Sequence, residues 1–171
     1  CSSDCKKGAI EVKGEFVSPT KLTCKTPDFR RLGPGEVEVR VSLKGDYFTT
    51  TYQKFDFFAV SDGAKCLAFG PGVLEGQAAG ETTMLVIQAR DMQNNPRTTG
   101  GDVFKVTIKP TSGAERHVEP LVEDQEDGTY VVSYTAPEAG AYSVDISFEG
   151  TFGGEAGRIR GAPFNPTFSE G

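Results

Sequence analysis

A strict alternation of side chains near residue 130 is the feature that most limits what this chain can fold into. Tyr130, Val132 and Tyr134 are separated by single intervening residues. Successive side chains of a β-strand point to opposite faces, so this spacing predicts a strand with these three side chains on one face. The preceding sequence EDQEDG (123–128) contains an Asp-Gly step, which is typical of a tight hairpin turn. We therefore predict a β-hairpin, with HVEPLVE (117–123) as its other arm.

Similar strand-like runs recur along the whole chain. They cover 9–18, 21–26, 36–45, 52–60, 82–90, 102–109 and 141–150. The 21 glycines and 10 prolines, without any long helical periodicity, favour short strands joined by tight turns. In the run 36–45, Val37, Val39, Val41 and Leu43 alternate with polar residues, which predicts one buried face and one solvated face. The chain is therefore predicted to be all-β, with strands at the spacing of a sandwich.

The predicted strands fall into two groups. The sequence SDGAK (61–65) follows an apolar run and precedes a new strand, so we expect a domain boundary there. This gives one unit at 1–60 and a second at 62–168. Only four strands are predicted in the first unit, which is few for an independent sandwich, so the first unit is expected to be incomplete.

Four blocks of the second unit carry a family resemblance. They are 65–81 (KCLAFGPGVLEGQAAGE), 100–108 (GGDVFKVTI), 126–150 (EDGTYVVSYTAPEAGAYSVDISFEG) and 159–164 (IRGAPF). In this order they resemble a filamin-type (actin-binding protein 280) repeat, which implies an immunoglobulin-like β-sandwich. The segment TFGGEAGR (151–158) is longer and richer in glycine than the usual hairpin of that family.

The first unit resembles the C-terminal part of an IPT/TIG domain. The matching residues are 12–27 (VKGEFVSPTKLTCKTP), 36–50 (EVEVRVSLKGDYFTT) and 52–58 (YQKFDFF). The IPT/TIG family is also immunoglobulin-like. Together the two resemblances imply tandem immunoglobulin-like β-sandwiches, the first of them incomplete.

The charge and hydropathy of the chain exclude two classes of partner. Its net charge of -6 offers no basic surface for nucleic acid, so we predict no nucleic-acid binding. No apolar run approaches the ~20 residues that span a bilayer, so we predict no membrane insertion by this segment. The first residues lack both a signal peptide and an initiating Met, and we interpret the chain as a fragment of a longer protein.

No residue is predicted to be catalytic, to hold a cofactor or to bind a metal. His117 is the one histidine and lacks a recognisable nucleophile and carboxylate partner. Cys66 is expected to pack as a small apolar residue in the opening strand. The acidic turn at 123–127 offers carboxylates that could bind calcium, but its spacing does not fit an EF-hand loop. The cysteine spacing does not supply the close pairs of a zinc site.

The cysteines near the start of the chain could form a disulfide. A bridge from Cys24 to Cys5 or to Cys1 would be sterically ordinary if their two strands pair, but the sequence alone does not establish it.

The filamin-type resemblance implies a docking site for other proteins. In repeats of this family that bind partners, a peptide adds as an extra strand beside strand C, in the groove between strands C and D. The matching segments here are 103–109 and 117–122. The candidate edge residues are Val103, Phe104, Lys105, Val106, Thr107, Ile108, Lys109, Val118 and Leu121. Lys105 and Lys109 could equally protect an exposed edge from aggregation, and this alternative stays open.

We therefore predict a non-enzymatic structural or scaffolding module of a larger multidomain protein. It would provide spacing and protein-protein docking in a cytoplasmic, cytoskeletal or ciliary setting. The alternative is an ectodomain segment of a cell-surface adhesion or receptor protein, which predicts a disulfide at Cys24. Against that alternative, Asn165-Pro166-Thr167 is no glycosylation sequon because of its proline.

Overall fold

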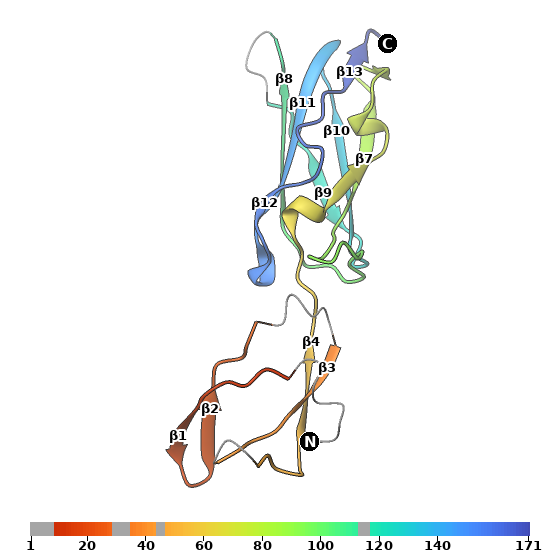
Figure 1. Cartoon of the computed structure of the whole chain (residues 1–171). Coiled ribbons are helices and arrows are strands. Elements are labelled where there is room, and N and C mark those ends of the chain that lie inside the picture. The colour runs from red at the N-terminus through yellow and green to blue at the C-terminus, as the bar shows by residue number, and fades with distance from the viewer. Residues whose placement is uncertain (1–8, 29–34, 44–46, 113–116) are drawn as a thin grey trace. The chain divides into compact units, whose positions relative to one another are not determined.

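A computed structural model of the chain describes residues 9–28, 35–43, 47–112 and 117–171. It consists of short strands joined by turns (Figure 1). The chain divides into two compact units, Cys1–Phe58 and Ala59–Gly171. In the part of the chain that the structure describes, no helix is long and apolar enough to cross a membrane. The all-β fold class predicted from the alternation of side chains is confirmed.

The described residues of the first unit form two antiparallel strand pairs. Strand β1 (Gly14–Ser18) pairs with β2 (Lys21–Cys24), and β3 (Gly35–Val39) pairs with β4 (Gln53–Phe57). The predicted buried face of 36–45 is wrong, because Val39 is 46% exposed and Leu43 is 88% exposed. Strand β3 ends at Val39, and among the described residues its ladder partner is β4, in a two-stranded sheet. A strand in which apolar and polar residues alternate buries its apolar face only where a second layer packs on that face.

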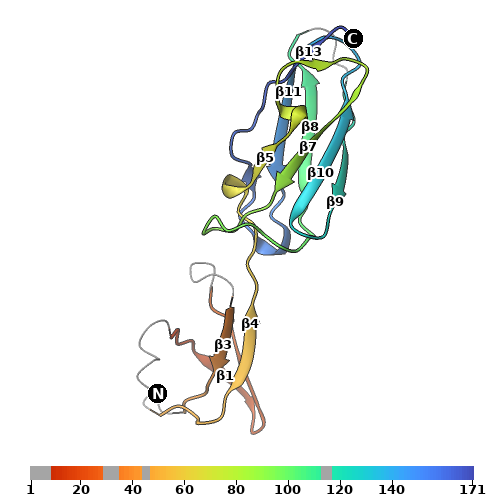
Figure 2. The same cartoon turned by 90° about the vertical axis from the view of Figure 1, so that its right-hand side faces the viewer.

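The second unit is built from two facing sheets (Figure 2). One sheet has the strand order β5-β7-β10-β9, and the other has the order β12-β11-β13-β6 with β8 paired to β11. The strands are β5 (Leu67–Phe69), β6 (Gln77–Ala78), β7 (Thr82–Gln88), β8 (Phe104–Pro110), β9 (Leu121–Asp124), β10 (Thr129–Thr135), β11 (Gly140–Phe148), β12 (Gly157–Arg158) and β13 (Thr167–Ser169). The described residues of this unit also form the short 3₁₀ turns η3 (Gly63–Lys65), η4 (Pro71–Val73) and η5 (Thr151–Gly153).

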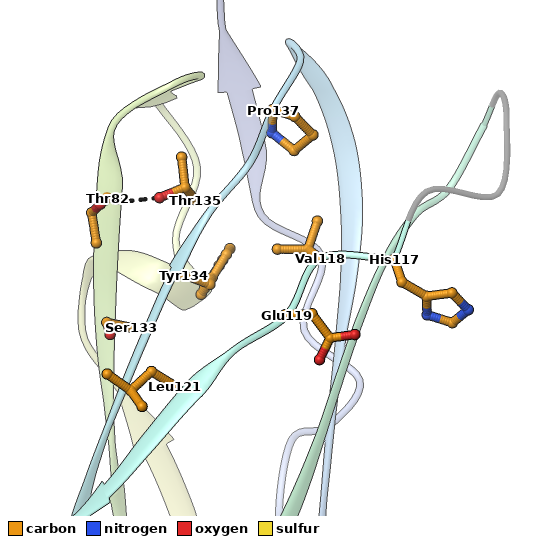
Figure 3. A pocket seen from close by; sticks show the side chains of 9 residues that line it. All are labelled: Thr82, His117, Val118, Glu119, Leu121, Ser133, Tyr134, Thr135 and Pro137. Carbon is orange, nitrogen blue, oxygen red and sulfur yellow. Dashed lines mark hydrogen bonds between the residues drawn. The ribbon is translucent and has the colours of Figure 1, made fainter.

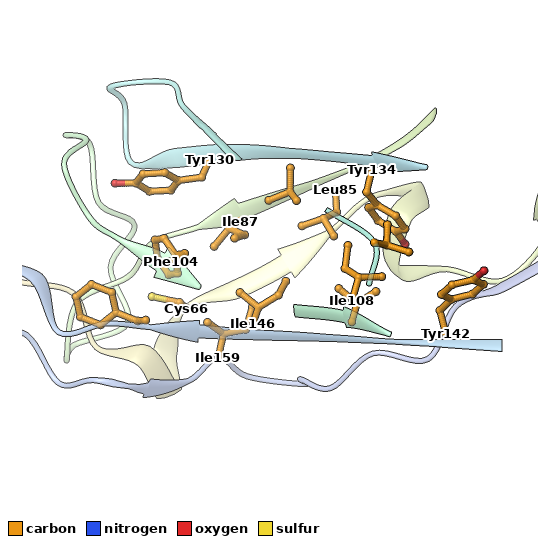
Figure 4. Packing of buried hydrophobic residues seen from close by; sticks show 14 of the residues in the cluster. Cys66, Leu85, Ile87, Phe104, Ile108, Tyr130, Tyr134, Tyr142, Ile146 and Ile159 are labelled. Atoms are coloured by element: carbon orange, nitrogen blue, oxygen red, sulfur yellow. The ribbon is translucent and has the colours of Figure 1, made fainter. Parts of the chain in front are cut away.

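The core of the second unit lies between these sheets (Figure 4). Tyr130, Val132 and Tyr134 of β10 are all buried, as their alternation predicts. The Phe104 ring of β8 lies 4.9 Å from the Tyr130 ring and 5.5 Å from the Phe148 ring, so aromatic contacts join the two sheets. The predicted hairpin is also present, since β9 and β10 pair antiparallel with Val132 opposite Val122.

The beginning and the end of the second unit run parallel to each other. Parallel bridges join Asp62 to Glu155 and Leu67 to Arg160, and β6 pairs parallel with β13. The Gly63 N–H donates to the Glu155 carbonyl at 2.8 Å. A Cβ on Gly63 would lie 2.5 Å from the Gly157 carbonyl oxygen, so this close approach requires glycine. The first residues of the unit are thereby fastened to its last ones.

Candidate functional site

Strand β8 has one edge that is largely open. It pairs with β11 along its whole length, from Phe104 opposite Phe148 to Pro110 opposite Tyr142. On its other edge, the described residues make a single bridge, between Ile108 and Val118. The Val118 N–H lies 3.5 Å from the Ile108 carbonyl, and backbone direction alternates along a strand. The N–H and C=O of Val106 therefore also face away from β11.

The side chains of β8 divide by the same alternation. Phe104 and Ile108 are buried in the core, and Val106 is half-buried. Lys105, Thr107 and Lys109 lie opposite Ser147, Asp145 and Ser143 on the outer face. Val103 precedes the strand and is exposed, with its backbone N–H bound to the Thr151 hydroxyl at 2.8 Å. The open edge thus lies beside two exposed cationic side chains, Lys105 and Lys109.

The predicted D-strand residues lie in two different environments. Leu121 begins β9 and is 58% exposed, at the outer edge of its sheet. Val118 is buried and its backbone occupies the β8 edge at Ile108. The predicted edge residues of β8 and β9 therefore lie on opposite sheets, with the segment that carries Val118 connecting them.

A groove of about 440 Å³ lies beside this connecting segment (Figure 3). Its lining combines the segment before β9 with the ends of β7 and β10: Thr82, His117, Val118, Glu119, Leu121, Ser133, Tyr134, Thr135 and Pro137. Figure 3 shows Val118 pointing toward Tyr134 and Pro137, whereas the imidazole of His117 points away from them. The sequence prediction included Val118 and Leu121 but missed the wall from β7 and β10. Pro120, which cannot donate to a ladder, was a signal that β9 begins late.

The acidic turn after β9 is satisfied by its own hydrogen bonds. Asp124 accepts from the Gly101 N–H at 2.7 Å and from the Glu126 N–H at 2.8 Å. Asp127 accepts from the Thr129 N–H at 2.9 Å and from its hydroxyl at 2.6 Å, which lowers the pKa of Asp127. Within the described ranges, no three His, Cys, Asp or Glu residues are grouped to hold a metal ion.

The two described cysteines have different environments. Cys66 is fully buried and lies just before β5 instead of inside it. Its burial raises the pKa of the thiol to about 11, which disfavours the reactive thiolate. Cys24 is exposed and forms no disulfide with a described residue. Cys1 and Cys5 lie outside the described residues, so the bridge to Cys24 stays a prediction.

A buried carboxylate lies at the opposite end of the sandwich core. Asp102 is 7% exposed and accepts a hydrogen bond from the Ser61 hydroxyl. Its backbone N–H donates to the Tyr130 hydroxyl at 2.9 Å. Burial raises the pKa of Asp102, while the Ser61 hydrogen bond and the charge of Arg97 act in the other direction. The hydrogen bond between Ser61 and Asp102 joins the first residues of the unit to the loop before β8.

The substitution Asp102→Asn is expected to remove one contribution to the dependence of stability on pH, a contribution that lowers stability as pH rises. Because the pKa of Asp102 in the folded state is raised above the ordinary value of 3.8, the folded state binds the proton more tightly than the unfolded state. The contribution of Asp102 to the free energy of unfolding should therefore fall as pH rises from about 4 toward the folded pKa and stay lowered above it, so the wild type should lose stability relative to the variant over this range. Asparagine is neutral and can still accept from Ser61. Urea titrations at a series of pH values test this, and parallel profiles for the two proteins would contradict it.

Comparisons with known proteins bear on the whole of this architecture. The family model described as Filamin/ABP280 repeat matches residues 60–165. The chain is 36% identical over 159 residues to the dynein alpha chain of the flagellar outer arm of Chlamydomonas reinhardtii. That match covers 93% of this chain and 4% of the dynein chain. It is longer than the second unit, so it includes part of the first.

Two further matches are with a curated relative and with a solved structure. The chain is 30% identical over 106 residues to the E3 ubiquitin-protein ligase TRIM45 of Bos taurus, covering 62% of this chain and 17% of that protein. The crystal structure of the Lin-41 filamin domain superposes with a TM-score of 0.52 at 21% identity. It covers 65% of this chain and 98% of the Lin-41 domain, and it shows a shared fold. The chain thus spans only a small part of the length of its curated relatives.

Proposed function

The chain belongs to the filamin/ABP280 repeat family, and from this premise we propose that it is a docking and spacing segment of a dynein-like heavy chain in a cilium or flagellum. The filamin-type immunoglobulin-like repeat is a non-enzymatic structural fold, which occurs as a unit of larger proteins. The observation that supports this proposal most strongly is the 36% identity to the flagellar outer-arm dynein chain across 93% of this chain. A match of this extent covers more than the repeat alone, which supports a common parent architecture.

The parent protein is expected to be found with axonemes. Cells of the source organism that express the tagged parent chain would be separated into axoneme, soluble and membrane fractions. The tag should be enriched in the axoneme fraction and should resist protease added to intact cells. Removal of the tag by external protease would instead support the alternative, an ectodomain of a cell-surface protein.

The docking mode that we propose is strand addition at the open edge of β8. Val106 directs an N–H and a C=O away from β11, so an extended segment of a partner can form ladder hydrogen bonds there. Lys105 and Lys109 on the outer face favour a partner strand with acidic side chains. The bridge from Val118 to Ile108 limits the accessible edge to the first part of β8 unless that segment moves aside.

Amide hydrogen exchange tests this mode of docking. In the free protein, the Val106 amide should exchange faster than the Thr107 amide, because Thr107 bonds to β11. A peptide selected from a library of extended sequences should slow exchange at Val106 by at least about tenfold and leave Thr107 almost unchanged. A selected peptide that binds without protecting Val106 would rule out this edge. The substitution Lys105→Glu, compared with Lys65→Glu far from β8 in sequence, tests the preference for acidic partners.

We propose that the first unit is an incomplete IPT/TIG-like sandwich. Among the described residues, its two antiparallel strand pairs support this interpretation, since each pair exposes an apolar side chain, Phe16 of β1 and Phe55 of β4. We propose that residues 1–60 and 62–168 act as consecutive units, which would space the parts of the parent chain.

A further inference from the structure

Strand β10 extends past the point where its neighbour β9 begins. Strand β7 pairs with β10 as far as Thr135, whereas β9 pairs with it only as far as Ser133. The Gln125 N–H donates to the Thr129 carbonyl, so Thr129 directs its backbone groups toward β9. Because the backbone direction alternates along a strand, the N–H and C=O groups of Ser133 and Thr135 also point toward the β9 side. Among the described residues, nothing pairs with the backbone N–H and C=O of Thr135 on that side.

The residues before β9 explain why this position stays open. If β9 continued backward by two residues, Glu119 would lie opposite Thr135. Pro120 cannot donate a ladder hydrogen bond and disfavours a regular strand at this point. Just before it, Val118 bridges to Ile108 on the other sheet, so the chain crosses away from β10. One strand position beside Thr135 is therefore left without a strand, and the groove of about 440 Å³ lies there.

Glu119 is the one carboxylate among the described residues that line this groove, and neither Lys nor Arg is among them. A second carboxylate residue, Glu81, is the sequence neighbour of the lining residue Thr82. Glu119 and Glu81 are exposed, and neither makes a salt bridge with any described residue. A cationic ligand group is therefore favoured in the groove.

We infer that this groove binds an extended peptide segment of a partner protein through the free backbone groups of Thr135, with a Lys or Arg side chain of the segment beside Glu119. The N–H and C=O of Thr135 select an extended peptide, because a peptide that pairs with them continues the β9–β10 ladder by one step. The apolar surfaces of Val118, Leu121 and Pro137 would contact the aliphatic part of the long cationic side chain. This site is on β10 and differs from the β8 edge of the proposed function, which carries lysines and favours acidic partners.

The test uses the ¹⁵N-labelled full chain and two capped pentapeptides, Thr-Val-Lys-Val-Thr and the same peptide with norleucine in place of lysine. Titrations are followed by the amide signals of the protein. The lysine peptide is expected to shift the Thr135 amide and to bind about fivefold more tightly than the norleucine peptide, as one ion pair at a partly exposed site allows. The substitution Glu119→Gln should remove this fivefold difference. Glu123→Gln, which removes the same charge from β9 outside the groove lining, should preserve it.

Each other result would overturn the inference. If Glu119→Gln and Glu123→Gln reduced the fivefold difference in affinity equally, the lysine peptide would be attracted to the acidic strand in general, with no site specific to the groove. Equal affinity for the two peptides would exclude a cation preference. Shifts at Val106 without shifts at Thr135 would place the peptide on β8, which would support the proposed function while excluding this second site. Because Glu119 is exposed, the variant is expected to remain folded, and the comparison of the two peptides on the wild type does not depend on any variant.

Discussion

Replacing Gly128 with alanine is expected to lower the free energy of unfolding of the second unit by about 3 kcal/mol. Gly128 has a φ of +87°, which costs an L-residue about 1–2 kcal/mol. A Cβ at this position would also lie 2.1 Å from the carbonyl oxygen of Arg97. That oxygen belongs to rigid backbone, so the loop before β8 must shift. The Gly128 carbonyl accepts from the Ala89 N–H at 3.0 Å and from the Gln88 side chain at 3.1 Å, and the shift would disturb both hydrogen bonds.

Gly80 provides the matched control for this substitution. Its φ of +82° is nearly the same, but no atom lies within 4 Å of an added Cβ. Gly80→Ala should therefore cost only about 1 kcal/mol, from backbone strain alone. Urea unfolding of the full chain, followed by NMR signals of the second unit, measures both values. If the two variants lost the same stability, the close contact with Arg97 would not be the cause.

Truncating Leu85 to alanine is expected to lower the free energy of unfolding by about 3 kcal/mol, within the usual range for a buried leucine. Leu85 lies in the centre of β7, has no exposed surface and belongs to the core cluster between the sheets. Its removal takes apolar atoms out of the core and leaves a cavity that the paired strands on both sides cannot readily close. Urea unfolding of the full chain measures the loss.

The adjacent Met84 is the control for the core position. It points to the opposite face of the same strand and is 55% exposed. Met84→Ala should change the free energy of unfolding by no more than about 0.5 kcal/mol. Comparable losses in Met84→Ala and Leu85→Ala would show that the outer face of this sheet is covered in solution.

The sequence was informative wherever a local pattern also had a second layer to pack against. The alternation of Tyr130, Val132 and Tyr134 predicted both a strand and its buried face, because β10 lies in the centre of a sheet that covers a core. The same kind of alternation at Val39 and Leu43 predicted a buried face that is absent. The pattern is local, but burial depends on what packs above the strand, which the sequence of that strand does not contain.

The candidate site was predictable to a similar degree. The resemblance to a known family identified the segment with β8 and Leu121, yet it did not reveal that Val118 bridges to Ile108. The open position beside Thr135 depends on where β9 starts, on Pro120 and on that bridge across the two sheets. Pro120 is visible in the sequence, whereas the bridge joins residues on different sheets and emerges only from the folded arrangement.

The parallel arrangement of the two ends of the second unit has a mechanical consequence. When the ends of the unit are pulled in opposite directions, parallel neighbouring strands must slide past each other. The hydrogen bonds donated by Gly63, Gly76, Ala79 and Arg160 across this seam then carry the force together. A terminal antiparallel hairpin would instead open one hydrogen bond at a time under the same pull. The seam is thus oriented to resist extension by shear, which would help the unit stay folded when the chain that contains it is under tension.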